Sequence, residues 1–103
     1  MNYKKLSGMD WVNLLIKNPE LSDKCEWEKL TGEDWVTLLI LYPRFAKYCN
    51  WEKLCNADWM LLLSFRPEFA KYCKWVLFYN MQWIYLINYQ PDLKKYRKVK
   101  NEL

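Results

Sequence analysis

Hydrophobic and polar positions follow a pattern that recurs every 24 residues along the chain. In register, the chain divides into four units without gaps: residues 3–26, 27–50, 51–74 and 75–98. The residues that mark the period are Trp11, Trp35, Trp59 and Trp83, then Trp27, Trp51 and Trp75, then Pro19, Pro43, Pro67 and Pro91. Tryptophans and prolines that keep the same phase through four units indicate a repeat architecture.

Each unit predicts two short helices. In residues 27–50 the first helix begins after Thr31. The Thr31 hydroxyl can accept a hydrogen bond from the Asp34 amide, and the Asp34 carboxylate can accept one from the Thr31 amide. The helix ends before Pro43, because the residue preceding a proline is disfavoured in the helical conformation. Pro43 then suits the first position of a second helix. Trp51 is expected to open a further helical turn or a short 3₁₀ segment.

The other units carry similar capping signals. The capping residues expected there are Ser7 with Asp10, Asn56 with Asp58, and Asn80. The recurring aspartates are therefore interpreted as helix caps, and a carboxylate row for metal binding or acid–base work is the alternative. The Glu-Lys pairs at 28–29 and 52–53 are expected on solvent-exposed faces.

The fold class follows from the period. A unit of 24 residues cannot bury its own apolar stripe, so successive units must stack. We predict one all-α domain over residues 1–103, a short right-handed α-solenoid of about four two-helix repeats. The chain resembles the leucine-rich repeat variant proteins in period and helix pairing, which implies alternating α- and 3₁₀ helices. Its pattern W-x-x-L-x-G-x-D-W-x-x-L-L-x-x-x-P resembles more closely tandem repeats of uncharacterised bacterial proteins, and that resemblance implies no catalytic residue.

Composition removes several classes of function. The chain has 103 residues and no histidine, which excludes a Ser-His-Asp or Cys-His catalytic apparatus and imidazole metal ligands. Its two glycines, Gly8 and Gly32, cannot build a phosphate-binding loop. The net charge of +4 is below that typical of a dedicated nucleic-acid binder. We therefore expect no enzyme activity, no cofactor and no metal.

The cysteines and the hydropathy suggest a compartment. No apolar h-region follows the N-terminus, and the longest apolar stretch, residues 75–89, is too short to span a bilayer. We expect a cytoplasmic protein without membrane contact, whose four cysteines are reduced thiols. Three of them occupy one repeat position and are interpreted as small buried residues. A disulfide framework is the alternative on count alone.

The positions that differ between units point to a binding surface. On the outward side of the first helix, two positions spaced i, i+4 change from polar to apolar or aromatic along the chain. They hold Asn13, Thr37, Leu61 and Tyr85, and then Lys17, Leu41, Phe65 and Tyr89. Exposed apolar patches commonly mark partner sites. The candidate partner-binding residues are Leu41, Leu61, Phe65, Arg66, Tyr85 and Tyr89. The alternative is that the C-terminal segment covers the last unit.

A cationic block closes the chain. Its residues are Lys94, Lys95, Arg97, Lys98 and Lys100. Solenoids need a polar terminal cap for solubility, which is one interpretation of this block. Contact with phosphate groups or with an acidic partner is the other.

These patterns favour a non-catalytic binding module that contacts another protein, or a second copy of itself, through the aromatic stripe. The small size is typical of an adaptor or of an inhibitor encoded by a phage or mobile element. The alternative is nucleic-acid binding, in which the cationic block holds phosphates while Tyr85 and Tyr89 stack on bases.

Overall fold

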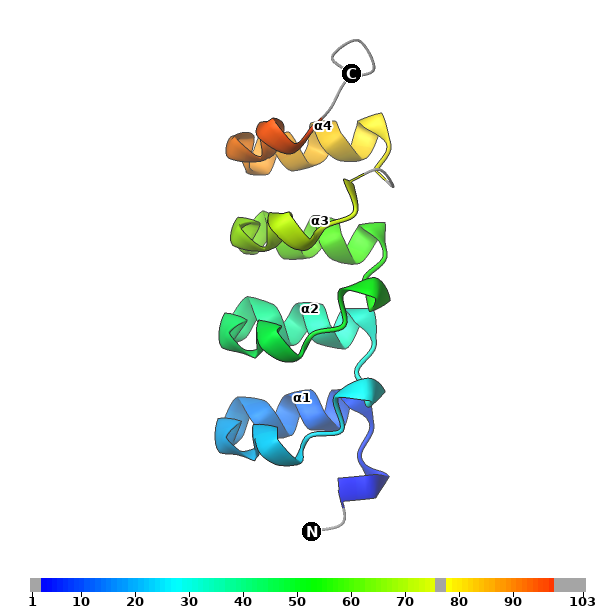
Figure 1. Cartoon of the computed structure of the whole chain (residues 1–103), viewed down its shortest axis with the longest axis vertical. Coiled ribbons are helices and arrows are strands. Elements are labelled where there is room, and N and C mark those ends of the chain that lie inside the picture. The colour runs from blue at the N-terminus through cyan, green and yellow to red at the C-terminus, as the bar shows by residue number, and fades with distance from the viewer. Residues whose placement is uncertain (1–2, 76–77, 98–103) are drawn as a thin grey trace. The chain divides into compact units, whose positions relative to one another are not determined.

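The computed structural model describes residues 3–75 and 78–97, and within these ranges the chain is all-α, with no strand. Four α-helices of ten residues each are each followed by a 3₁₀ helix that begins at a proline (Figure 1). The α-helices are α1 (Gly8–Lys17), α2 (Gly32–Leu41), α3 (Asn56–Phe65) and α4 (Asn80–Tyr89). The 3₁₀ helices after them are η2 (Pro19–Lys24), η4 (Pro43–Tyr48), η6 (Pro67–Tyr72) and η8 (Pro91–Tyr96). Shorter 3₁₀ turns are η1 (Tyr3–Lys5), η3 (Trp27–Lys29) and η5 (Trp51–Lys53). No helix of the described chain is long and apolar enough to cross a membrane.

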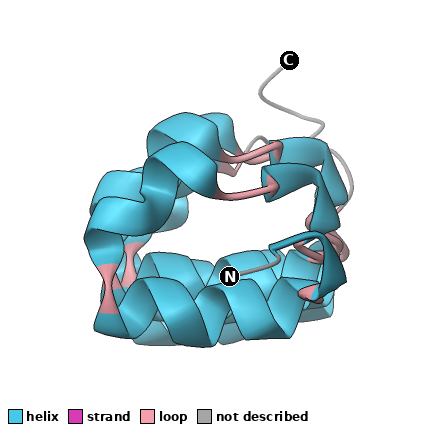
Figure 2. Cartoon of the chain, turned by 90° about the horizontal axis from the view of Figure 1, so that it is seen from below, coloured by secondary structure: helices cyan, strands magenta, loops and turns pink. Residues whose placement is uncertain are grey.

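The chain forms two compact units, residues 1–55 (unit 1) and residues 56–103 (unit 2). In unit 1, α1 packs against α2, and in unit 2, α3 packs against α4. Within each unit the α-helices form one layer, and the 3₁₀ helices that follow them form a second (Figure 2). Each unit therefore stacks two consecutive repeats in the manner of an α-solenoid.

The second helix predicted for each repeat is a 3₁₀ helix of six residues. In the second repeat it starts at Pro43, whose fixed φ angle suits the first helical position. It ends at Tyr48, and the next residue, Cys49, has an extended backbone with φ −75° and ψ 132°. 3₁₀ helices serve as short connectors, and one of six residues is longer than most. The turn predicted at Trp51 is also 3₁₀.

The tryptophans at the first repeat position form the core. Trp11 is fully buried, and Trp35, Trp59 and Trp83 are at most 6% exposed. The second tryptophan series, Trp27, Trp51 and Trp75, is half-buried. Each of these residues lies at the start of a 24-residue repeat. Its members pack on the first series, since the ring centroids of Trp27 and Trp35 lie 5.3 Å apart. The aromatic content of the chain thus serves mainly to fill each repeat.

Two of the predicted helix caps are confirmed. Ser7 Oγ accepts from the Asp10 amide at 3.1 Å, and the Asp10 carboxylate accepts from the Ser7 amide at 2.9 Å. Thr31 and Asp34 form the same reciprocal pair at the same distances. These boxes satisfy backbone donors that the first helical turn leaves without partners.

The cap predicted at Asn80 is wrong. Tyr79 precedes α4 and occupies the capping position, while Asn80 is the first residue of the helix. Gln82 Oε1 accepts from the Tyr79 amide at 2.9 Å, which preserves half of the capping box. Asn56 likewise lies inside α3 as its first residue. In both repeats the helix starts at the position that the 24-residue register predicts. It does not start after the nearest residue with a good capping side chain.

The expectation that the Glu-Lys pairs face solvent is confirmed for the glutamates and only in part for the lysines. Lys29 and Lys53 are half-buried, whereas Glu28 and Glu52 are exposed. Lys29 Nζ donates to the carbonyl oxygens of Lys4 at 2.8 Å and Leu6 at 3.0 Å. Lys53 Nζ donates in the same way to Leu30 O at 2.8 Å. Each of these lysines joins its repeat to the preceding one.

Candidate functional site

A shallow hollow of about 470 Å³ lies on the outer side of α3 and α4 in unit 2. The residues that line it are Ala57, Met60, Leu61, Ser64, Phe65, Tyr85 and Tyr89. Five of them come from α3 and two from α4. We name this surface the α3–α4 hollow.

Helix geometry explains why these residues meet. Leu61 and Phe65 are spaced i, i+4 on α3, and Tyr85 and Tyr89 have the same spacing on α4, so each pair shares a helix face. The opposite face of α3 carries buried residues, including Leu62 and fully buried Leu63. Packing α3 against α4 places the two outward pairs on the same hollow.

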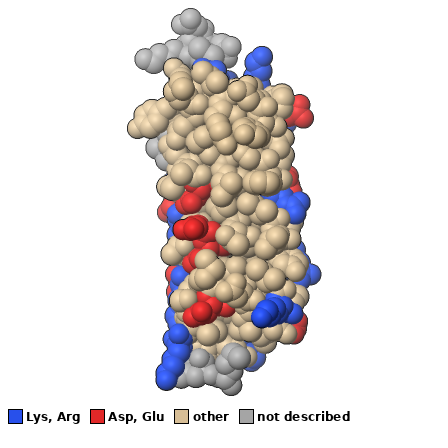
Figure 3. All heavy atoms as spheres, turned by 180° about the vertical axis from the view of Figure 1, so that it is seen from behind, with Lys and Arg blue, Asp and Glu red and all other residues tan. Residues whose placement is uncertain are grey.

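The lining of the hollow is apolar and well exposed. Leu61 is 52%, Phe65 61%, Tyr85 47% and Tyr89 59% exposed. No charged residue lines the hollow, and the sequence of α4 contains none. The surface over most of α3 and α4 is accordingly free of charged side chains (Figure 3). Large exposed apolar side chains grouped in this way are unusual on a protein that has no partner.

The two tyrosines form a paired aromatic wall. Their ring centroids lie 4.8 Å apart with an interplanar angle of 41°. A hydrogen bond between the two side chains raises the pKa of Tyr85, so its hydroxyl stays protonated at neutral pH. The nearby Ser64 Oγ donates to the Met60 carbonyl oxygen at 2.7 Å. The polar atoms of this hollow are thus suited to hydrogen bonding.

Four of the six predicted partner-binding residues line the α3–α4 hollow: Leu61, Phe65, Tyr85 and Tyr89. Leu41 is 52% exposed but lies on α2 in unit 1. Arg66 is half-buried and precedes η6, outside the hollow lining.

Three lining residues were not predicted, namely Ala57, Met60 and Ser64. Ala57 lies one turn before Leu61 on α3, and Met60 and Ser64 lie on either side of Leu61 along the helix. The helical spacing around Leu61 therefore predicts all three. The prediction used only the positions that change type between units, and it therefore missed these neighbours.

The structure describes three of the five residues of the cationic block. Lys94 and Lys95 are exposed at the end of η8, and Lys95 Nζ lies 5.5 Å from the centroid of the Tyr96 ring. Arg97 donates to Asn80 Oδ1 at 3.3 Å. Lys98 and Lys100 lie outside the described residues. The Arg97 contact ties the end of the last repeat to the start of α4.

The three cysteines of the repeat position are poorly suited to nucleophilic chemistry. Burial raises the pKa of Cys25, Cys49 and Cys73 to about 12, so these thiols stay protonated at neutral pH. A protonated thiol is neither a good nucleophile nor a metal ligand. Among the described residues, no group of three cysteine or acidic side chains could hold a metal ion.

None of the protein-family models, curated proteins and solved structures compared with this chain matches it.

Proposed function

We propose that this chain is a non-catalytic binding module whose α3–α4 hollow binds another protein. The single observation that carries this proposal is the clustering of Leu61, Phe65, Tyr85 and Tyr89, all 47–61% exposed, around one uncharged hollow. Tyrosine and phenylalanine are enriched at interfaces because they bury a large apolar area with few rotatable bonds.

The chemistry of the hollow constrains the partner. Because no charge lines it, a charged side chain of the partner would lose its hydration there without gaining an ion pair. We infer that the partner inserts aliphatic or aromatic side chains and places a hydrogen-bonding group near the tyrosine hydroxyls. A second copy of the chain could present such side chains. A larger protein could also present them, and the chain would then act as its adaptor or inhibitor.

A binding role rather than catalysis is also part of the proposal. The hollow offers no charged acid or base, and its serine hydroxyl is engaged by Met60. A cytoplasmic location belongs to the same proposal, because free thiols suit a reducing compartment.

The test compares two variants in quantitative affinity purification from the native host. Tyr85→Ala combined with Tyr89→Ala removes the aromatic wall. Met81→Ala is the matched control, because Met81 is an equally apolar residue of α4, 76% exposed and outside the hollow. We expect the double variant to lose the specifically retained partner at least tenfold, while Met81→Ala retains it.

Two further measurements separate the alternatives. If the partner is a second copy of the chain, light scattering of the purified protein should report a dimer, which the double tyrosine variant should convert to a monomer. Binding to single-stranded nucleic acid that falls steeply with salt, and that disappears on reversing Lys94 and Lys95, would favour the nucleic-acid alternative. Retention of the partner by the double variant would overturn the proposal.

A further inference from the structure

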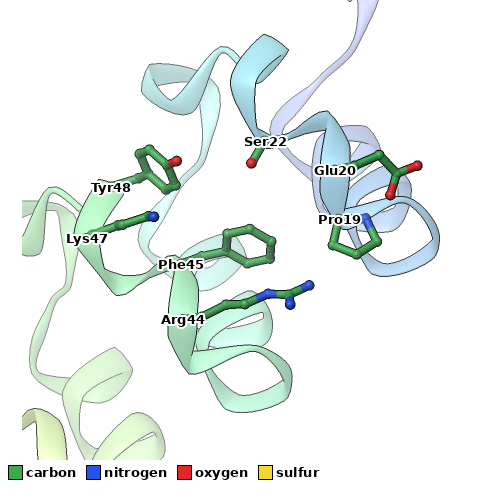
Figure 4. A pocket seen from close by; sticks show the side chains of 7 residues that line it. All are labelled: Pro19, Glu20, Ser22, Arg44, Phe45, Lys47 and Tyr48. Carbon is green, nitrogen blue, oxygen red and sulfur yellow. The ribbon is translucent and has the colours of Figure 1, made fainter.

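A second hollow, of about 410 Å³, lies in unit 1 between the 3₁₀ helices η2 and η4. The residues that line it are Pro19, Glu20, Ser22, Arg44, Phe45, Lys47 and Tyr48. Arg44, Phe45, Lys47 and Tyr48 project from η4 toward η2, where Ser22 directs its hydroxyl into the same space (Figure 4). We name this surface the η2–η4 hollow.

Two of its residues depart from the repeat pattern. Arg44 occupies a position that is acidic in the other three repeats, where Glu20, Glu68 and Asp92 stand. Ser22 supplies a hydroxyl at a position held elsewhere by Ala46, Ala70 and Lys94. The repeat period demands neither residue. Both departures line the same hollow, which indicates that they serve a purpose other than folding.

The cations of the hollow are held in place by aromatic rings. The Arg44 guanidinium carbon lies 5.4 Å from the Tyr42 ring centroid and 5.2 Å from that of Phe45. Lys47 Nζ lies 5.3 Å from the Tyr48 ring centroid. Neither cation forms an ion pair with a carboxylate of the described chain. Their charge therefore remains available to a ligand.

The floor of the hollow is rigid and apolar. Phe45 is 3% exposed, and the Tyr48 ring stacks on Trp27 with centroids 4.5 Å apart and an interplanar angle of 10°. Trp27 in turn stacks on Trp35, which is 1% exposed. A site whose walls are fixed in this way loses little conformational entropy when it binds a ligand.

We infer that the η2–η4 hollow binds an acidic peptide segment, in which a carboxylate side chain is followed closely by an apolar one. The guanidinium of Arg44 matches a carboxylate through paired N–H donors, and Lys47 and the hydroxyls of Ser22 and Tyr48 supply further donors. Pro19 and the ring of Tyr48, both half-buried, provide the contact for the apolar side chain. A free inorganic anion would leave these two apolar surfaces uncovered, which is why a peptide fits better.

The test is a titration of isotope-labelled protein, followed through its backbone amide NMR signals. The probe is the peptide acetyl-Glu-Leu-Glu-Phe-Glu-amide, and its counterpart with glutamine at each glutamate is the uncharged control. We expect the acidic peptide to shift the amides of residues 20–24 and 44–48, which follow the two prolines, and the glutamine peptide to leave them unchanged.

Three variants assign the effect to the hollow. Arg44→Asp and Ser22→Ala install residues that the other repeats use at these positions, so both should fold normally. We expect Arg44→Asp to weaken peptide binding at least about tenfold and Ser22→Ala about threefold. Lys71→Asp is the matched control, because it removes a cation of η6 in unit 2 that lies over the Tyr72 ring. It should leave the affinity unchanged.

The outcomes are separable from those of the α3–α4 hollow, since the variants lie in different units. If Lys71→Asp weakens binding as much as Arg44→Asp does, the attraction is general electrostatics and the proposal is wrong. If inorganic phosphate shifts the η2 and η4 amides while the acidic peptide does not, the hollow takes a small anion and the peptide assignment is wrong.

Discussion

Unit 1 and unit 2 each join two repeats, and equivalent residues meet at each junction. In unit 1, Gly8 at the start of α1 lies against Asp34, so that a Cβ at Gly8 would overlap the Asp34 carboxylate and lie 2.5 Å from the Lys29 carbonyl oxygen. In unit 2 the equivalent residues are Asn56 and Gln82, and Asn56 Nδ2 donates to Gln82 Oε1 at 3.3 Å. A close backbone approach in one unit is replaced by a side-chain hydrogen bond in the other.

A second junction contact is kept by different residues. In unit 1 the Tyr42 hydroxyl donates to the Ile16 carbonyl oxygen at 3.3 Å, and in unit 2 Gln90 Nε2 donates to the Ser64 carbonyl oxygen at 2.8 Å. Both acceptors lie in the last turn of an α-helix, where carbonyl groups lack partners within the helix. The contact is retained because the preceding repeat leaves that carbonyl unsatisfied.

The outer faces of the two units differ in another way. Asn13 and Lys17 of unit 1 are polar, whereas Leu61 and Phe65 occupy the equivalent positions in unit 2. The residue differences at the junctions preserve a contact between repeats. The differences on the outer face change the chemistry of the surface. Residues that maintain the stack are thus distinct from the residues that we propose bind a partner.

The largest loss of stability is expected when Gly8, at the junction of unit 1, is replaced by asparagine, the residue at the equivalent position of unit 2. Gly8→Asn forces a side chain into space held by the Asp34 carboxylate and the Lys29 carbonyl group. Overpacking of this kind costs about 1–3 kcal/mol in the free energy of unfolding. Urea denaturation followed by tryptophan fluorescence measures the loss, and amide hydrogen exchange in α1 and α2 localises it.

Two companion variants show whether the junction acts as a pair. Gly8→Asn combined with Asp34→Gln reproduces the pair of unit 2 and should recover part of the lost stability, because Gln82 both caps its helix and accepts from Asn56. Asn56→Ala, the milder change in unit 2, should cost about 0.5–1.5 kcal/mol. If Gly8→Asn alone proves neutral, α1 and α2 do not approach each other as closely as Gly8 indicates.

An intermediate effect is expected at the aspartates of the two capping boxes. Asp10 and Asp34 make the same hydrogen bonds, but Asp34 is 6% exposed and Asp10 is exposed. Loss of a helix cap costs about 0.5–2 kcal/mol. We expect Asp34→Ala to fall at the upper end of that range and Asp10→Ala to cost less than Asp34→Ala, as measured by urea denaturation at neutral pH. Equal losses would show that burial against the neighbouring repeat adds nothing to the cap.

The pH dependence of Asp10→Ala provides its control. Hydrogen bonds from the Ser7 amide and hydroxyl lower the pKa of Asp10 below its ordinary value of 3.8. The contribution of Asp10 is therefore complete above the pKa of the unfolded chain and is lost as the pH falls through the lower pKa of the folded chain. The variant and the original chain should differ in stability at pH 7 and converge on acidification.

Much of the fold follows from the sequence because its signals are local. The tryptophan and proline period sets the register, and Ser7 and Thr31 are capping residues at positions that the register also selects. At residues 79 and 80 the two signals disagree, because the register places Tyr79 before the helix whereas residue type favours Asn80. The helix follows the register, because the buried Trp83 fixes the position of the helix.

The α3–α4 hollow is predictable in part for the same reason. Helical spacing places Leu61 with Phe65 and Tyr85 with Tyr89, and the packing of α3 on α4 joins the two pairs. The role of Lys29 could not be predicted, because its acceptors are backbone carbonyl groups 23 and 25 residues earlier, and a backbone acceptor leaves no mark on residue type.

The smallest effect is expected where the two units already share a contact. Tyr42→Phe removes the hydroxyl that donates to Ile16 but keeps the ring, which packs edge-on to Phe45 with centroids 6.1 Å apart. Gln90→Met removes the donor to Ser64 with little change in volume. Each change should cost about 0.5–1.5 kcal/mol, because a carbonyl group at a helix end loses its donor.

The two losses should also differ in order. Gln90→Met is expected to cost more than Tyr42→Phe, since its hydrogen bond is 2.8 Å long compared with 3.3 Å for that of Tyr42. Urea denaturation of both variants beside the original chain measures the difference. A loss in only one unit would mean that the other helix end is satisfied by water, and that the shared contact is a consequence of the repeat rather than a cause of its stacking.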